Sequence, residues 1–287
     1  MKLFYCKLEA GNFGDDLNEW IWDHLLPGWR EWDPEVTLVG VGTLINAPNL
    51  LPYAERRMVI MGSGVGYGGG TIPALDPKWD VRCLRGPRSA MLLGLPESIG
   101  ITDPATMLSD LPVFGAGERS AKPIFVPHWE SVSLVNWQEA CRRCDVEFVD
   151  PRGDARHVIG KISRAPLVLA ESMHAAIIAD TFRVPWIPIR IGRSFLASKW
   201  QDFFMSNGIE AEIEPLHEDR IRFPSRIGPI STRKLARKFH CQILNIHAAR
   251  DLQMALKRPA FLSQDATLNR NKERFQEALD KVRRVYG

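Results

Sequence analysis

Short hydrophobic runs alternate along the chain with segments whose hydrophobic positions recur at helical spacing. In the first part of the chain we expect strands at 3–6, 37–45, 58–61, 81–84 and 99–102, and helices at 17–26 and 89–93. Strands that alternate with helices are typical of a parallel sheet covered by helices. The pattern therefore predicts an α/β fold.

The same alternation begins again after a glycine-rich and charged stretch at 115–122, which we interpret as an interdomain linker. Here we expect strands at 123–127, 146–149, 167–170 and 186–191, and helices at 136–143, 155–163, 173–181 and 195–207. The chain is therefore predicted to form two Rossmann-like, doubly wound domains, over 1–116 and 117–287. Such sheets bind ligands at the carboxyl ends of their strands, and two of them face to face would leave a cleft.

The last part of the second domain, about 220–287, has a helical pattern and is strongly basic. It carries 16 Lys and Arg residues against five Asp and Glu, whereas the whole chain has a net charge of only +3. Four of its basic residues fall on one side of a helix: Arg233, Lys234, Arg237 and Lys238. We expect this side to bind an anionic membrane surface weakly; the alternative is a solvated helix face that packs on the second domain.

Cysteine content and hydropathy indicate the compartment. The five cysteines are an odd number, and neither a signal-type nor a membrane-spanning apolar run is present, so we expect reduced thiols and a cytoplasmic protein. Cys141 and Cys144 form a single CxxC pair at the end of a predicted helix. Because most structural zinc sites need four ligands, we expect this pair to hold no metal and to do no redox work.

A polar loop with two glycines, GNFGDD at 11–16, follows the first strand directly. Glycine lets the backbone approach a ligand, and amides at a helix start can bind an anion. We therefore predict that Asn12 and Gly14 contact substrate and that Asp15 or Asp16 acts as a base or holds a sugar hydroxyl. The alternative is an ordinary strand-to-helix turn with Asp15 or Asp16 as the N-cap.

Arg85 lies between a predicted strand and the next helix, where a planar guanidinium at the rim of a ligand site suits phosphate or carboxylate. Glycine-rich turns follow the strands near 38–45 and 61–70. They favour a surface of backbone amides that binds phosphate or substrate. Neither turn matches a dinucleotide-binding motif in its proper context, so tight turns without a ligand are the alternative.

Two histidines also follow predicted strands, His128 after the first strand of the second domain and His174 after a later one. Histidine titrates near neutral pH, so each is a candidate acid or base, although a lone histidine is often structural. Trp129, beside His128, is a candidate platform for a sugar ring.

In this order, the motifs resemble the polysaccharide pyruvyl transferase family, and in particular exopolysaccharide ketal pyruvyltransferases of the succinoglycan type. The segments that carry the resemblance cover about the first 210 residues: GNFGDDLN at 11–18, LVGVGTLI at 38–45, MGSGVGYGG at 61–69, RGPRSAMLLG at 85–94, TDPATML at 102–108, VPHW at 126–129, ESMHAAIIAD at 171–180, VPWIPI at 184–189 and the helix at 199–208. The resemblance implies a GT-B-like fold and phosphoenolpyruvate as donor substrate, with no cofactor.

The resemblance also implies roles for single residues. Arg85 looks like the arginine that grips the donor, and His174 looks like the histidine of a Ser-Arg-Leu-His motif. That motif reads Glu-Ser-Met-His at 171–174, so Ser172 stands where the family commonly has arginine. Three basic residues are candidates for the missing charge: Arg164, Arg190 and Arg193.

The reaction implied is ketal formation on a sugar of a lipid-linked oligosaccharide, with His174 or His128 as the acid. We expect no nucleic-acid partner. Two alternatives remain from the sequence: a nucleotide-sugar glycosyltransferase of similar fold, and a non-catalytic subunit of a polysaccharide assembly complex.

Overall fold

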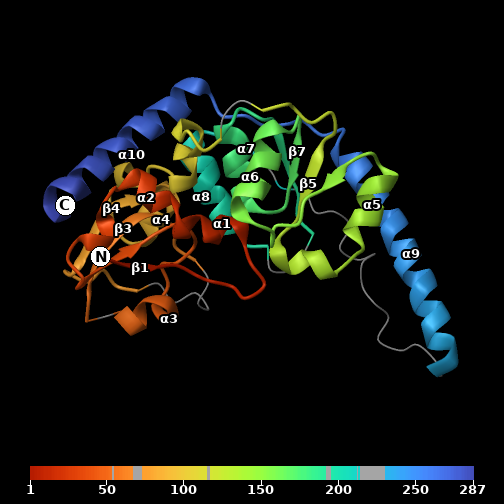
Figure 1. Cartoon of the computed structure of the whole chain (residues 1–287), viewed down its shortest axis with the longest axis horizontal. Coiled ribbons are helices and arrows are strands. Elements are labelled where there is room, and N and C mark those ends of the chain that lie inside the picture. The colour runs from red at the N-terminus through yellow and green to blue at the C-terminus, as the bar shows by residue number, and fades with distance from the viewer. Residues whose placement is uncertain (54, 67–72, 115–116, 192–194, 212, 214–229) are drawn as a thin grey trace. The chain divides into compact units, whose positions relative to one another are not determined.

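The computed structural model describes residues 1–53, 55–66, 73–114, 117–191, 195–211, 213 and 230–287, with only the backbone described over 230–241 (Figure 1). The chain divides into two compact units. Unit 1 comprises Met1–Gly115, Leu196–Ala211 and Ser263–Gly287, and unit 2 comprises Ala116–Phe195 and Glu212–Leu262. The division after residue 115 coincides with the expected linker.

Unit 1 contains a parallel sheet of four strands in the order β1-β2-β3-β4. The strands are β1 (Lys2–Phe4), β2 (Val36–Val39), β3 (Arg57–Ser63) and β4 (Trp79–Leu84). Every residue of β2 is buried, as expected for a strand covered on both faces. The helices of this unit are α1 (Phe13–Asp16), α2 (Ile21–Leu25), α3 (Ala47–Leu50), α4 (Pro87–Leu92), α8 (Ala197–Asn207) and α10 (Asp265–Tyr286).

Two expected elements of unit 1 are wrong. Residues 99–102 form no strand: a 3-10 turn, Glu97–Ile99, is followed by a single bridge from Gly100 to Leu84, and Pro104 then starts another 3-10 helix. The predicted helix at 17–26 is broken into a 3-10 turn, Leu17–Glu19, and α2. The break lies beside Asn18, whose buried side chain is hydrogen-bonded outside the helix.

The C-terminal helix α10 packs on unit 1, although we expected it in the second domain. Its buried side chains lie along one face: Leu268, Phe275, Leu279 and Val282. Tyr286 donates a hydrogen bond of 2.9 Å to Asp80 in β4, and Asn271 donates one of 2.7 Å to the carbonyl of Ser206 in α8. Unit 1 therefore draws α8 and α10 from beyond residue 116. An amphipathic pattern shows that a helix packs on a core, but not on which core.

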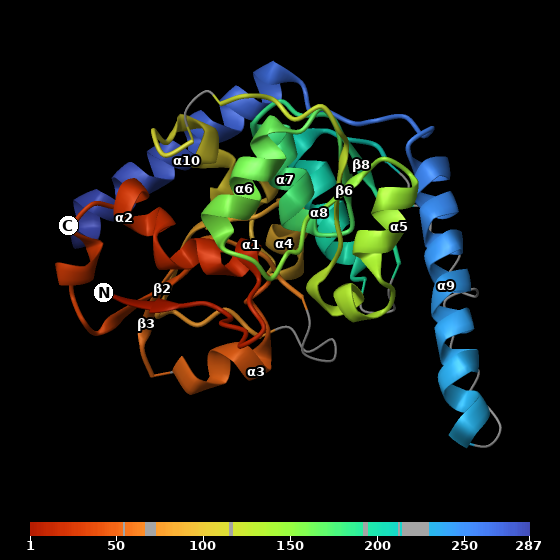
Figure 2. The ribbon, with the colours of Figure 1, turned by 45° about the vertical axis from the view of Figure 1, so that its right-hand side comes forward.

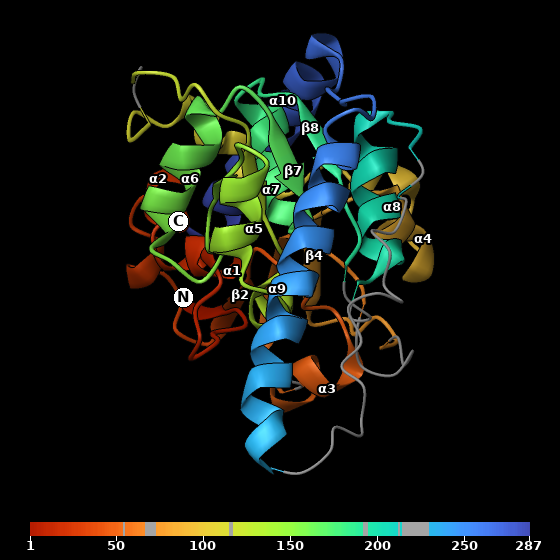
Figure 3. The ribbon, with the colours of Figure 1, turned by 90° about the vertical axis from the view of Figure 1, so that its right-hand side faces the viewer.

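Unit 2 contains the second parallel sheet, in the order β6-β5-β7-β8. Its strands are β5 (Ile124–Val126), β6 (Glu147–Phe148), β7 (Val168–Ala170) and β8 (Trp186–Pro188). Helices α6 (Ala155–Arg164) and α7 (Met173–Thr181) cover one face, and α5 (Trp137–Arg143) and α9 (Ile230–Ala255) lie side by side on the other (Figures 2 and 3). The α/β class and the two parallel sheets predicted from the sequence are thus confirmed.

The basic residues Arg233, Lys234, Arg237 and Lys238 fall in the first part of α9. The backbone is helical there, as expected, but their side chains lie outside the description. Among the residues that are described, no helix is both long and apolar enough to cross a membrane.

Candidate functional site

The loop after β1 holds its two carboxylates close to Asn12. The Asn12 side chain donates a 2.6 Å hydrogen bond to Asp15, and its backbone N–H donates one of 3.0 Å to Asp16. Asn12 is the N-cap of α1, and both aspartates lie in the first turn of that helix. Asp16 is also the N-cap of the 3-10 turn Leu17–Glu19, but its side chain makes no capping hydrogen bond there. Burial raises the pKa of Asp16 above its usual 3.8, and the hydrogen bond from Asn12 opposes part of this rise.

Asn18 connects this loop to the loop after β2. Its side-chain amide donates to the carbonyls of Asp15 and Val41, both at 2.9 Å, and its carbonyl accepts from the backbone N–H of Val41 at 2.8 Å. The residue is fully buried. Asn18 was not among the residues predicted from the sequence, although it lies within the GNFGDDLN motif.

The glycine turns after β2 and β3 lie against charged side chains. A Cβ on Gly42, whose φ is +129°, would lie 3.1 Å from the Asp15 carboxylate, and one on Gly64 would lie 2.2 Å from the Arg85 guanidinium. Gly64 also donates a backbone hydrogen bond of 2.9 Å to Gly42. Glycine is therefore needed at these turns for the close approach of charged groups to the backbone. Residues 67–70 of the second turn lie outside the described residues.

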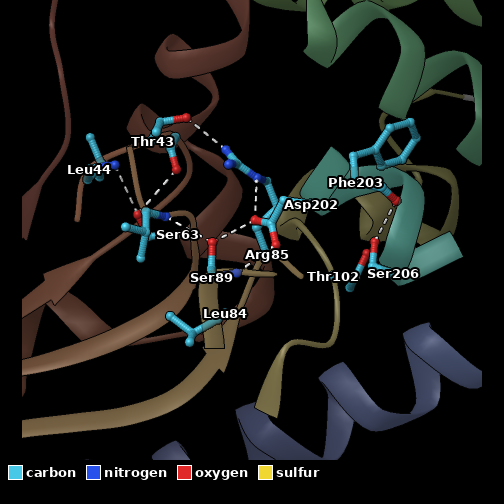
Figure 4. Close-up of polar contacts among 12 residues, drawn as sticks. Thr43, Leu44, Ser63, Leu84, Arg85, Ser89, Thr102, Asp202, Phe203 and Ser206 are labelled. Atoms are coloured by element: carbon cyan, nitrogen blue, oxygen red, sulfur yellow. Dashed lines mark hydrogen bonds and ion pairs between the residues drawn. The ribbon is translucent and has the colours of Figure 1, made fainter. Parts of the chain in front are cut away.

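Arg85 follows β4 and is the centre of a buried polar network (Figure 4). Its Nε donates to Asp202 of α8 at 3.3 Å, and its Nη1 donates to the Thr43 hydroxyl at 2.8 Å. Asp202 also accepts from the backbone N–H of Ser89 at 2.9 Å and from its hydroxyl at 2.6 Å. The carboxylate thus pairs with Arg85 and satisfies a backbone amide in the first turn of α4.

The Arg85 side chain, which we expected at the rim of a ligand site, is completely buried. The exposed fraction of its side chain is 0%, and that of Asp202 is 2%. The Nη2 atom, which lies over Gly64, has no hydrogen-bond partner within the described part of the chain. A buried guanidinium nitrogen without a partner is costly, so this atom is the part of the network that could receive an anionic ligand.

The corresponding edge of unit 2 is organised around Glu171, which follows β7 and is 1% exposed. Its carboxylate accepts from the backbone N–H of His128 at 2.8 Å, from the Ser131 hydroxyl at 2.9 Å and from the backbone N–H of Ile191 at 3.1 Å. Glu171 therefore connects the segments that follow β5, β7 and β8. Its place directly after a predicted strand was the signal that could have identified it.

Both candidate histidines lie at this edge. His128 follows β5 and His174 is the second residue of α7, which follows β7; these strands are neighbours, with Val126 paired to Ala170. His174 is 7% exposed, whereas His128 is partly exposed, with Nδ1 3.9 Å from Glu130.

Two further candidates from the sequence lie beside the histidines. The ring of Trp129 is tilted, 5.9 Å from that of His128 between centroids, so it does not stack on it. Ser172 is the N-cap of α7, and its side chain makes no capping hydrogen bond. The edge therefore brings His128, Trp129, Ser172 and His174 to adjacent strand ends.

Cys141 and Cys144 are buried in the core of unit 2. Burial raises the pKa of both thiols, and Cys144 Sγ donates to the carbonyls of Ala140 and Cys141, both at 3.4 Å. Across the described part of the chain, no group of three or more His, Cys, Asp or Glu side chains is placed to hold a metal ion.

The fold and these residues define a class: an α/β protein of Rossmann-like organisation that collects polar and basic side chains at the carboxyl edges of two parallel sheets. The family model for polysaccharide pyruvyl transferases matches residues 43–193, which is more than half of the chain. This match includes Arg85, His128 and His174.

One relative is similar along its whole length. The chain is 41% identical to the succinoglycan biosynthesis protein ExoV of Rhizobium meliloti (strain 1021), over an alignment of 319 positions that covers 100% of both chains. No solved structure matches the chain. The chain therefore belongs to the polysaccharide pyruvyl transferase family, and it is an enzyme that transfers pyruvyl groups onto a polysaccharide.

Proposed function

We propose that the chain moves pyruvate from phosphoenolpyruvate onto a sugar of an exopolysaccharide precursor and forms a pyruvate ketal. The buried Arg85 guanidinium carries the proposal, because its Nη2 faces a glycine backbone and has no partner among the described residues. A planar cation in a dry site suits the phosphate or carboxylate of this donor. The relative named for succinoglycan biosynthesis supports the choice of an exopolysaccharide.

The chemistry requires an acid, a base and an anion clamp. An acid protonates the methylene carbon of phosphoenolpyruvate and leaves positive charge on the adjacent carbon. A sugar hydroxyl adds there and gives its proton to a base; the C–O bond to phosphate then breaks, and a second hydroxyl adds with loss of its proton. One of the two released protons replaces the one taken up by the methylene, and the other leaves with phosphate or buffer.

The residues at the two sheet edges supply these groups in our proposal. His174 or His128 is the acid, since histidine can hold a proton near neutral pH. Asp15 or Asp16 is the base or the anchor of a sugar hydroxyl, with Asn12 holding both carboxylates. Trp129 and Ser172 contact substrate. No metal ion or other cofactor takes part.

We further propose a GT-B-like arrangement, in which two Rossmann-like domains face each other across a cleft. The two parallel four-stranded sheets support this, since sheets of this kind bind ligands at the carboxyl ends of their strands. Closure of such a cleft around phosphoenolpyruvate would reduce the radius of gyration in solution scattering, and an unchanged radius at saturating donor would argue against it.

The acceptor in this proposal is a lipid-linked oligosaccharide, and the basic part of α9 brings a cytoplasmic enzyme to the anionic membrane surface. Each Lys or Arg near such a surface contributes about 1 kcal/mol, and salt screens the attraction. We expect flotation with anionic but not neutral liposomes at low salt, lost when Arg233, Lys234, Arg237 and Lys238 are changed to Gln. Equal flotation of this variant would show that α9 is a solvated face.

The test of the donor is phosphate release from phosphoenolpyruvate in the presence of a panel of lipid-linked oligosaccharides. We expect release only with a suitable acceptor. Binding of a uridine or guanosine diphosphate sugar, with no turnover of phosphoenolpyruvate, would favour the nucleotide-sugar glycosyltransferase instead.

A further inference from the structure

Arg190 lies just beyond β8, at the same edge of unit 2 as His128 and His174. Its two neighbours in the chain are fixed by hydrogen bonds. The backbone N–H of Ile189 donates to the carbonyl of Ala170 at 2.9 Å, and that of Ile191 donates to the Glu171 carboxylate at 3.1 Å. The backbone at Arg190 is therefore held beside the end of β7.

The direction of the Arg190 side chain follows from the strand pattern. Ile187, Ile189 and Ile191 all belong to the hydrophobic cluster under α5 and α9. Because side chains of an extended segment alternate between faces, Arg190 projects to the opposite face, which α7 covers. The first turn of α7 carries His174.

The register of the sheet relates Arg190 to Ser172. Ala170 in β7 is paired with Pro188 in β8, so two residues farther along each segment stand Ser172 and Arg190. Arg190 therefore follows β8, the strand paired with β7, and Ser172 follows β7. Arg164 does not share this position. Arg164 ends α6 at the opposite edge, where its carbonyl accepts from Ser120, and Arg193 lies outside the described residues.

Within the part of the chain that the structure describes, the charge of Arg190 has no protein partner. Its Nε is buried and has no hydrogen-bond partner, and no ion pair involves its guanidinium, in the described part of the chain. Arg152, which follows β6 at the same edge, is instead paired with Asp150 at 2.7 Å. The nearby Glu171 carboxylate accepts from three neutral donors. An uncompensated, partly buried guanidinium is a site for an external anion.

We infer that Arg190 binds an anionic group of the donor, the phosphate or the carboxylate of phosphoenolpyruvate, on the α7 side of the unit 2 sheet. This inference rests on the proposed function. It makes Arg190 a donor-binding residue of unit 2, and it selects Arg190 rather than Arg164 for the charge that Ser172 lacks.

The test compares Arg190→Ala and Arg190→Lys with Arg152→Ala as the matched control from the same sheet edge. A charge-assisted hydrogen bond is lost in Arg190→Ala, so KM for phosphoenolpyruvate should rise about 10-fold or more. The inhibition constant of inorganic phosphate should rise in parallel if the phosphate group is the one bound, and stay constant if the carboxylate is. Arg190→Lys should recover part of the loss, and Arg152→Ala should stay within about 2-fold of wild type.

An unchanged KM for phosphoenolpyruvate in Arg190→Ala would overturn the inference while wild-type turnover of the donor keeps the proposed function intact. A wild-type enzyme that does not use phosphoenolpyruvate would overturn both. If Arg190→Ala does not fold, as judged by circular dichroism, Arg190→Gln takes its place and the same criteria apply.

Discussion

The carboxyl edges of the two sheets place buried charge in opposite ways. In unit 1 a buried arginine, Arg85, is paired with a carboxylate from a distant part of the chain, Asp202. In unit 2 a buried carboxylate, Glu171, is bound by two backbone N–H groups and a hydroxyl, while Arg190, one of the arginines at that edge, has no ion pair among the described residues.

The difference indicates how each edge is prepared for an anion. Asp202 fixes the Arg85 guanidinium in one orientation over Gly64 and leaves Nη2 available, at the cost of part of its positive charge. Glu171 instead orders the backbone at three strand ends, and Arg190 at this edge has no ion pair within the described residues. We therefore expect unit 1 to supply a rigid, oriented contact and unit 2 a contact that depends more on net charge.

The largest effect should come from the acid at the unit 2 edge. Of His174→Ala and His128→Ala, one should lose about 10²–10⁴-fold in turnover, the usual contribution of a positioned proton donor. Steady-state kinetics with phosphoenolpyruvate and acceptor measure this, and thermal unfolding checks the fold. Near-normal turnover in both variants would mean that the acid lies elsewhere; aggregation of both would favour purely structural histidines.

Removal of the carboxylate at each edge should affect stability unequally. Asp202→Asn leaves a buried guanidinium without its counter-charge and should cost about 3–5 kcal/mol of unfolding free energy. The three hydrogen bonds described for Glu171 come from neutral donors, two backbone N–H groups and a hydroxyl, so Glu171→Gln should cost about 1–3 kcal/mol. Urea denaturation measures the free energy of unfolding of both variants. A loss in Glu171→Gln that equals or exceeds the loss in Asp202→Asn would contradict this expected difference between the two edges.

Arg85→Ala should weaken donor use by about 10²-fold or more, because a charge-assisted contact in a dry site is lost. It also leaves Asp202 buried and unpaired, so stability and binding must be separated. The double variant Arg85→Met with Asp202→Asn removes both charges and should be more stable than Asp202→Asn alone, yet still fail to use the donor. Unchanged kinetics in Arg85→Ala would exclude it from the site.

The pH dependence tests the loop after β1. If Asp16 is the base, kcat/KM should fall as the pH is lowered through its pKa, which burial holds above 3.8. Glu19 also raises this pKa by charge repulsion, so Glu19→Gln should move the acidic limb to lower pH. Asp16→Asn should lose most of its activity and also the acidic limb of its pH profile. If the acidic limb is unchanged in that variant, the limb belongs to another titrating group.

The smallest effect is expected far from either edge. Cys141→Ser combined with Cys144→Ser should leave activity within a few-fold, since both thiols are buried in the core of unit 2 and burial raises their pKa. Loss of activity accompanied by loss of bound zinc, measured by elemental analysis, would refute this.

Local sequence patterns were sufficient to predict those elements whose structure depends on residues close together in the sequence. The helix predicted at 173–181 has those bounds in the structure, because a continuous apolar segment follows directly on a strand and can be buried on all sides. The candidate residues at strand ends, such as Arg85, His128 and His174, could be found because parallel strands place their following residues at one edge.

Long-range contacts explain what the sequence could not predict. Asn18, in the 3-10 turn before the break in the expected helix, bonds to Val41, 23 residues away, and Asp202 pairs with Arg85 across 117 residues. Neither Asn18 nor Asp202 lies in a local sequence pattern that would predict its distant partner. The packing of α10 on unit 1 is a similar case, because its apolar face is compatible with either core.

The central claim is that the enzyme forms a pyruvate ketal from phosphoenolpyruvate. The most direct measurement incubates the purified chain with carbon-labelled phosphoenolpyruvate and a lipid-linked oligosaccharide, and follows released phosphate and the mass of the saccharide together. We predict one phosphate for each labelled pyruvyl group gained, with the new group bridging two hydroxyls of one sugar. Phosphate release without any label on the saccharide would contradict the account.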